Sequence, residues 1–151
     1  MSEPLQHSRA FLLLLVALTA MGPFAMQIFL PALPAIQSAY AVDVATAQLV
    51  FSLSGVAMAL GTLAYGPLAD RHGRRPVLVA AVVLFVVGSV VATAAPTIEL
   101  LILGRIVQAA GGVAGLVLSR TIVRDLFDRS RAAEMIAWLT VGMVAVPMVS
   151  P

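Results

Sequence analysis

Long apolar runs separated by short polar breaks dominate the chain. A helix needs about 20 predominantly apolar residues to cross the hydrocarbon core of a membrane. Five segments meet or nearly meet that length, at about 10–30, 47–65, 77–94, 100–123 and 132–151. The pattern predicts an all-α integral membrane protein in which 1–151 forms one transmembrane bundle of about five helices.

The first apolar run allows two interpretations. Arg9 followed by "AFLLLLVALTA" resembles the start of a cleaved signal peptide. The run continues through "MGPFAMQIFL", however, which is longer than a signal-peptide core and favours a retained helix. We expect the two prolines of "LPALP", at 30–34, to end this helix. We expect Pro76 in the first turn of the third helix, where its missing N–H costs nothing.

Composition agrees with a lipid environment and excludes several classes of protein. The chain is 61% hydrophobic and 11% charged, whereas about a quarter of the residues in a soluble domain are charged. It has no cysteine, which excludes disulfides and thiolate metal sites. All nine basic residues are arginines, which excludes a phosphate-binding P-loop with its lysine. The arginines lie between apolar runs and form no basic face, so we expect no nucleic-acid partner.

The arginines also predict an orientation. Eight of the nine lie in the N-terminal tail, in the break after the second run, or in the region after the fourth run: Arg9, Arg71, Arg74, Arg75, Arg120, Arg124, Arg129 and Arg131. The breaks after the first and third runs hold only acids as charged residues, Asp43 and Glu99. Because cytoplasmic loops carry an excess of Lys and Arg, we expect the N-terminus and these eight arginines in the cytoplasm.

Arg105, the ninth arginine, lies inside the fourth run. An arginine at the centre of a membrane helix costs about 2.5–3.5 kcal/mol on insertion scales. It therefore either faces a cavity or extends to the outer membrane interface. Gln108 lies three residues later on the same helical face, and Gln27 is the only strongly polar side chain of the first run, at a similar depth. Gln27 and Arg105 could share one cavity, or Gln27 could be a satisfied structural residue.

Small residues follow Arg105. Gly111 and Gly115 form a GxxxG pair, and Gly112 lies between them. Such glycines allow another helix to approach closely, so packing is the simplest interpretation of all three.

The remaining polar residues form no catalytic or metal-binding pattern. His7 and His72 lie in the tail and in a break, and neither has a second ligand at metal-binding spacing. The apolar runs contain no nucleophile–base pair. We therefore expect no enzymatic activity, no catalytic residue and no metal site.

The break "YGPLADRHGRRPVL" concentrates polar residues in a regular order. "GPLADRHGRRP" resembles the motif G-x-L-x-D-R-x-G-R-R between the second and third helices of the major facilitator superfamily, matched by Gly66, Leu68, Asp70, Arg71, Gly73, Arg74 and Arg75. "GRIVQAAGG" resembles the family's fourth-helix motif R-x-x-Q-x-x-G. "LPALP" and "SRTIVRDLF" resemble the Bcr/CflA-type drug-resistance branch, and the resemblance covers essentially the whole chain.

The resemblance implies a proton-driven antiporter that exports drugs or small metabolites by alternating access from a bacterial inner membrane. The family has twelve helices in two six-helix halves, each built from two inverted three-helix repeats. This chain would supply the first repeat and most of the second, with the sixth helix and the C-terminal half absent. The expected partners are the lipid bilayer, a small-molecule substrate, protons and the missing half. No cofactor is expected, and the isolated chain is expected to be inactive.

By resemblance, Gln27, Arg105 and Gln108 are candidates to line the substrate and coupling cavity. The drug-resistance branch commonly has Asp where this chain has Gln27, and a glutamine cannot carry a proton. No acid that could pair with Arg105 is visible in the sequence. Glu99 is six residues away and off the same helical face. The fifth-helix motif of the antiporters is a Gly-Pro-rich run, of which only "VPMVSP" is present.

The polar break is expected to act as a gating loop at the cytoplasmic ends of packed helices. Asp70 can pair with Arg74 or with an arginine after the fourth run, Arg120 or Arg124. Asp125 can accept from Arg71 or Arg74. Pairs made in one state and broken in the other would bias a two-state transporter. The alternative is that these arginines only hold the loop in the cytoplasm. The alternative for the whole chain is a non-transporting membrane module that packs with partner helices.

Overall fold

The computed structural model describes residues 9–148, and these form five helices and no strand. They are α1 (Arg9–Tyr40), α2 (Val44–His72), α3 (Arg74–Thr93), α4 (Ile98–Leu126) and α5 (Arg129–Met148). The predicted all-α membrane fold is confirmed. Within the described range, four helices are long and apolar enough to cross a membrane, α1 to α4. The first turns of α5 hold Arg129, Arg131 and Glu134, which lowers its mean hydropathy.

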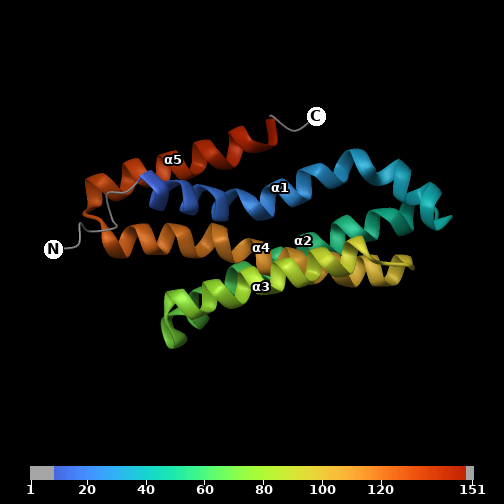
Figure 1. The fold of residues 1–151 in the computed structure, drawn as a ribbon, viewed down its shortest axis with the longest axis horizontal. Helices are drawn as coiled ribbons and strands as arrows, with labels where there is room; N and C mark the ends of the chain where they lie inside the picture. Colours follow the sequence, from blue (N-terminus) through green and yellow to red (C-terminus); the bar gives the residue numbers. More distant parts are fainter. Residues whose placement is uncertain (1–8, 149–151) are drawn as a thin grey trace.

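Helix α4 is the centre of the bundle. It packs against α3, α2 and α1, whereas α5 lies beside α1 (Figure 1). It is the most buried of the four candidate spans. The outer faces of α2 and α3 instead expose large apolar side chains such as Leu63 and Val90. Such faces are typical of helices that contact lipid or further helices.

Local chemistry explains where two of the helices begin. The Asp43 carboxylate accepts a hydrogen bond of 3.0 Å from the Thr46 N–H, which caps α2. Hydrogen bonds from the Thr46 side chain and from the Thr46 N–H lower the pKa of Asp43 below its ordinary value. Thr97 caps α4 in the same way by accepting from the Leu100 N–H.

The prediction that "LPALP" ends the first helix is wrong. Helix α1 continues through Pro31 and Pro34 to Tyr40. Each proline removes one backbone hydrogen bond, but tertiary packing holds the last turns in place. Leu33, Ile36 and Tyr40 pack on a buried cluster that includes residues of α2 and α4, and the Tyr40 hydroxyl donates to the Ala95 carbonyl at 2.8 Å.

The break between the second and third runs is also shorter than expected. Helix α2 runs to His72 and α3 begins at Arg74, so Gly73 is the one non-helical residue between them. Gly73 has φ 89°, a left-handed conformation that favours glycine. Pro76 lies in the first turn of α3, as the sequence predicts. The chain therefore reverses direction over a single residue, and most of the segment expected to form a gating loop is helical.

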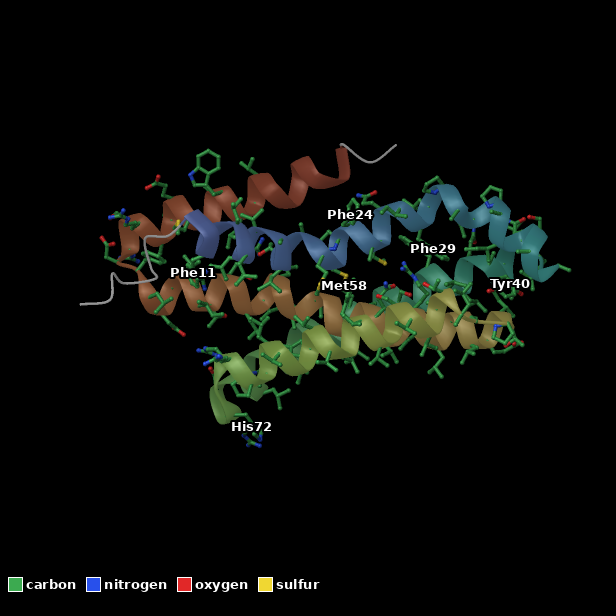
Figure 2. The ribbon with its side chains drawn as sticks, in the orientation of Figure 1. Phe11, Phe24, Phe29, Tyr40, Met58 and His72 are labelled. Carbon is green, nitrogen blue, oxygen red and sulfur yellow. The ribbon has the colours of Figure 1, made fainter. Side chains whose placement is uncertain are left out.

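Opposite ends of the bundle differ in charge. Figure 2 shows His72 at one tip, pointing away from the bundle, and Tyr40 at the far end of α1. The end of α2, the start of α3, the end of α4 and the start of α5 meet at the His72 end (Figure 1). The arginines that follow the second and fourth apolar runs therefore lie at one end of the molecule.

Candidate functional site

Arg105 lies on the buried face of α4, with 8% of its surface exposed. Its Nη1 donates to Gln108 Oε1 at 2.5 Å, and its Nη2 donates to the Ala25 carbonyl of α1 at 3.0 Å. The guanidinium carbon lies 4.5 Å from the centre of the Phe29 ring, a distance at which the ring face attracts a cation. In Figure 2, Phe29 extends from α1 toward the helices below it.

Gln108 extends this network to a third helix. Its Nε2 donates to Ser89 Oγ of α3 at 2.7 Å, and Ser89 Oγ donates to the Phe85 carbonyl at 2.7 Å. One set of hydrogen bonds therefore joins α1, α3 and α4 around Arg105. Ser89 was not among the residues predicted for the site, although it and Thr93 are the only polar residues in the apolar run at 77–94.

The Arg105 network contains neutral partners and no acid. Among the described residues, both ion pairs belong to Arg74, so no described carboxylate lies within 4.0 Å of Arg105. Arg105 Nε is buried and has no hydrogen-bond partner in the described part of the chain. The positive charge of Arg105 is thus stabilised by an amide oxygen, a carbonyl oxygen and an aromatic ring. Its Nε–H donor has no described partner.

Gln27 does not join this network. Its side chain is exposed and forms no hydrogen bond within residues 9–148. The structure brings Arg105 and Gln108 together as the spacing predicts, but it leaves Gln27 on the surface of α1.

Glycines allow the helices around Arg105 to approach closely. A Cβ on Gly115 would lie 1.9 Å from the Leu18 carbonyl oxygen of α1, and one on Gly111 would lie 2.5 Å from the Ala81 carbonyl oxygen of α3. A Cβ on Gly112 would lie 3.0 Å from the Gly22 Cα. These three glycines therefore lie at backbone contacts between α4 and its neighbours.

Two further glycines lie at such contacts. A Cβ on Gly88 of α3 would lie 2.3 Å from the backbone nitrogen of Gln108, and one on Gly104 would lie 2.6 Å from the backbone nitrogen of Ala92. The α3–α4 contact around Arg105 and Gln108 thus depends on small residues from both helices.

A second polar group lies at the charged end of the bundle. Arg74 Nη1 donates to Asp70 Oδ1 at 2.6 Å, and Arg74 Nε donates to Asp125 Oδ2 at 3.1 Å. Asp70 is in the last turn of α2, Arg74 begins α3 and Asp125 is in the last turn of α4. One arginine therefore joins the ends of three helices. The side chains are 29%, 64% and 51% exposed for Arg74, Asp70 and Asp125, so water screens both pairs.

The other proposed gating residues do not join these ion pairs. Arg71 and Arg75 are exposed, and neither they nor Arg120 and Arg124 form an ion pair with a described carboxylate. Of the alternative pairings the sequence allows, the structure contains only those through Arg74. A Cβ on Gly66 would meet nothing within 4 Å.

The described residues contain no group of three side chains able to hold a metal ion. The ring Nδ1 of His72 lies 3.2 Å from the Leu68 carbonyl of its own helix. His7 and the end of "VPMVSP" lie outside the described residues.

Comparison with known proteins decides the family. The model of the Major Facilitator Superfamily matches residues 13–151. The chain belongs to this family. No solved structure matches it.

Several curated relatives are named for drug resistance. The chain is 31% identical over 146 residues to multidrug resistance protein D of Escherichia coli, covering 97% of this chain and 37% of the relative. It is 34% identical to a chloramphenicol resistance protein of Pseudomonas aeruginosa, covering 94% and 34%. It is 30% identical to a bicyclomycin resistance protein homolog of Haemophilus influenzae, covering 93% and 35%. The chain spans about a third of the length of the curated relatives it matches.

Proposed function

We propose that this chain forms the first five helices of a secondary active transporter that exports drugs or small metabolites, coupled to protons, by alternating access. Membership of the major facilitator superfamily and the drug-resistance names of the relatives support a transporter. Substrate class, proton coupling and direction of transport are part of the proposal.

The buried Arg105 is the observation that supports this function best. Ionisable residues inside membrane helices are costly and usually line a substrate or ion pathway. Arg105 joins three helices at a polar position within an apolar bundle, and its described partners are all neutral. A neutral network leaves the positive charge available to attract a carboxylate or the polar group of a substrate.

We assign distinct roles to the two polar groups. Arg105 and Gln108 line the cavity for substrate or coupling ion, and Gln27, which is exposed on α1 and outside their network, is a further candidate. Asp70, Arg74 and Asp125, with Gly66, Arg71, Gly73 and Arg75, form the gate, and Arg120 and Arg124 are alternative partners in the other state. Gln27 cannot titrate, so a proton-carrying acid would come from another part of the transporter.

The positions of the arginines also support an orientation for the proposed transporter. Arginines gathered at one end of the bundle match the excess of Lys and Arg on cytoplasmic loops. We therefore place the Gly73 end and the N-terminus in the cytoplasm, and the protein in a bacterial inner membrane.

Reconstitution of the full-length protein that contains this chain tests the proposal. Chloramphenicol and bicyclomycin are suitable probes because relatives are named for resistance to them. In proteoliposomes with an imposed pH gradient, we expect flux of at least one probe that stops when the gradient is dissipated. Residues 1–151 alone, reconstituted in the same way, are the matched control and should give no flux.

Two outcomes would contradict the proposal. Flux of equal size with and without the gradient would reject proton coupling. Absence of flux for these probes and for a wider panel of drugs would favour the alternative, a membrane module that only associates with other helices.

A further inference from the structure

A hollow of about 500 Å³ lies between the end of α4 and the start of α5. Two arginines and four apolar residues line it: Arg124, Phe127, Arg129, Ala132, Ala133 and Ile136. Both arginines are exposed, whereas Ala132 is buried and Phe127 and Ile136 are half-buried. The hollow thus combines exposed cations with a partly buried apolar lining.

The positive charge at this hollow is not neutralised by the described acids. Both described ion pairs involve Arg74, one of them with Asp125. Asp128 accepts a hydrogen bond of 2.9 Å from the Ser130 hydroxyl, and Glu134 is exposed and does not line the hollow. An anion entering the hollow would therefore meet two guanidinium groups without a described carboxylate partner.

A third arginine lies on the same face of α4. Arg120 precedes Arg124 by one helical turn, and residues four apart are neighbours on a helix surface. Its Nε is buried and has no hydrogen-bond partner within the described range. Arg120 is not among the residues that line the hollow, but it adds a further positive charge one helical turn from Arg124.

We propose that this hollow binds an anionic phospholipid, with the headgroup phosphate on Arg124 and Arg129 and an acyl chain on the apolar lining. Guanidinium groups bind phosphate through paired, charge-assisted hydrogen bonds. Basic pockets between transmembrane helices suit anionic headgroups, and the hollow lies where α4, a candidate membrane span, ends. A free phosphate would use the cations but not the apolar lining. This binding does not depend on the proposed transport.

Native mass spectrometry of the delipidated full-length protein in detergent tests the proposal. The probes are dioleoyl phosphatidylglycerol and dioleoyl phosphatidylcholine, which share acyl chains and differ in net charge. We expect tighter binding of phosphatidylglycerol. Arg124→Gln and Arg129→Gln should each weaken it about five-fold, because each arginine near an anionic surface contributes about 1 kcal/mol.

Arg131→Gln is the matched control. It removes the same charge from an exposed residue of α5 that does not line the hollow, and binding should stay within two-fold of the wild type. Arg124→Lys and Arg129→Lys keep the charge and should retain most of the preference. They also provide a test if a glutamine variant does not fold.

Four results would overturn the proposal. Equal binding of the two lipids would show that negative charge is not preferred. A structure of the full-length protein in which another part of the chain covers the hollow would exclude a lipid from it. An equal loss in Arg131→Gln would show general charge attraction without a site. Displacement of phosphatidylglycerol by inorganic phosphate at the same concentration would indicate a free-anion site.

Discussion

Arg105 and Arg74 carry the same charged group in two different surroundings. Arg105 is 8% exposed and its partners are an amide, a carbonyl and an aromatic ring. Arg74 has a side chain that is 29% exposed, and its partners are two ionised carboxylates. Exposed ion pairs contribute only about 0–1 kcal/mol each, so they can be exchanged easily, whereas loss of a buried charged partner costs several kcal/mol. The difference agrees with the roles proposed for Arg74 in a gate and for Arg105 in a cavity.

The largest difference in stability should be between an alanine at the α1–α4 contact, at Gly115, and an alanine at the charged end, at Gly66. Gly115→Ala places a Cβ against the backbone of α1, 1.9 Å from an oxygen. We expect a loss of about 3 kcal/mol or a failure to fold, measured as thermal unfolding and yield of the full-length protein in detergent. Gly66→Ala, where a Cβ meets nothing within 4 Å, is the matched control and should change stability by less than about 0.5 kcal/mol. Equal losses would show that the α1–α4 contact is not tight.

Removal of the buried charge should have the next largest effect. Arg105→Leu leaves Gln108 and the Ala25 carbonyl without their donor, and we expect drug flux to fall about 100-fold, or roughly 3 kcal/mol. Arg105→Lys should recover only part of it, because an ammonium lacks the planar donors that reach both partners. Flux in proteoliposomes measures both. Wild-type flux in Arg105→Leu would exclude Arg105 from the transport pathway.

The gating contacts should give smaller effects that depend on salt. Asp125→Asn weakens an exposed ion pair worth about 0.2–1 kcal/mol, so we expect the ratio of inward-open to outward-open molecules to change by up to about five-fold. Spin-label distance distributions measure this ratio. Added salt should shift the wild type in the same direction, because water and ions screen the pair. Arg71→Gln, which removes an exposed arginine without a described carboxylate partner, should leave the ratio unchanged.

Asp43, at the opposite end of the bundle from Arg74, should give the smallest effect. Its folded-state pKa lies below the ordinary value of 3.8 because it accepts hydrogen bonds from the Thr46 side chain and from the Thr46 N–H. Its contribution to stability is therefore present above the unfolded-state pKa and is lost as the pH falls through the folded-state pKa. Between pH 6 and pH 3, the unfolding temperature should fall slightly more for the wild type than for Asp43→Ala. An equal fall would show that the cap does not stabilise α2.

The sequence predicted the features that depend on local pattern. Apolar run length located five helices, and helical spacing placed Arg105 beside Gln108. Contacts between residues of different helices could not be predicted from local pattern. Ser89 and the Ala25 carbonyl meet the Arg105 network only because α1 and α3 pack on α4. "LPALP" predicted a helix end by local rules, but packing of Tyr40 and its neighbours keeps α1 helical beyond it.

The sequence also did not determine which ion pairs Asp70 and Asp125 form at the charged end of the bundle. Asp70 had several possible arginines, and Asp125 had two. Selection of Arg74 depends on the reversal at Gly73, which brings the end of α2 and the start of α3 to the end of α4. That reversal uses one residue, whereas the sequence suggested a longer loop.

The most direct test compares Arg105→Leu with Arg74→Gln in one preparation of the full-length protein. Spin-label distances would give the ratio of inward-open to outward-open molecules, and equilibrium binding of a probe drug, chloramphenicol or bicyclomycin, would give affinity. We predict that Arg74→Gln changes the ratio and leaves the affinity of each state unchanged, whereas Arg105→Leu lowers the affinity about 100-fold and leaves the ratio of the drug-free protein unchanged. If both variants changed the same quantity, the separation of a gate from a cavity would be contradicted.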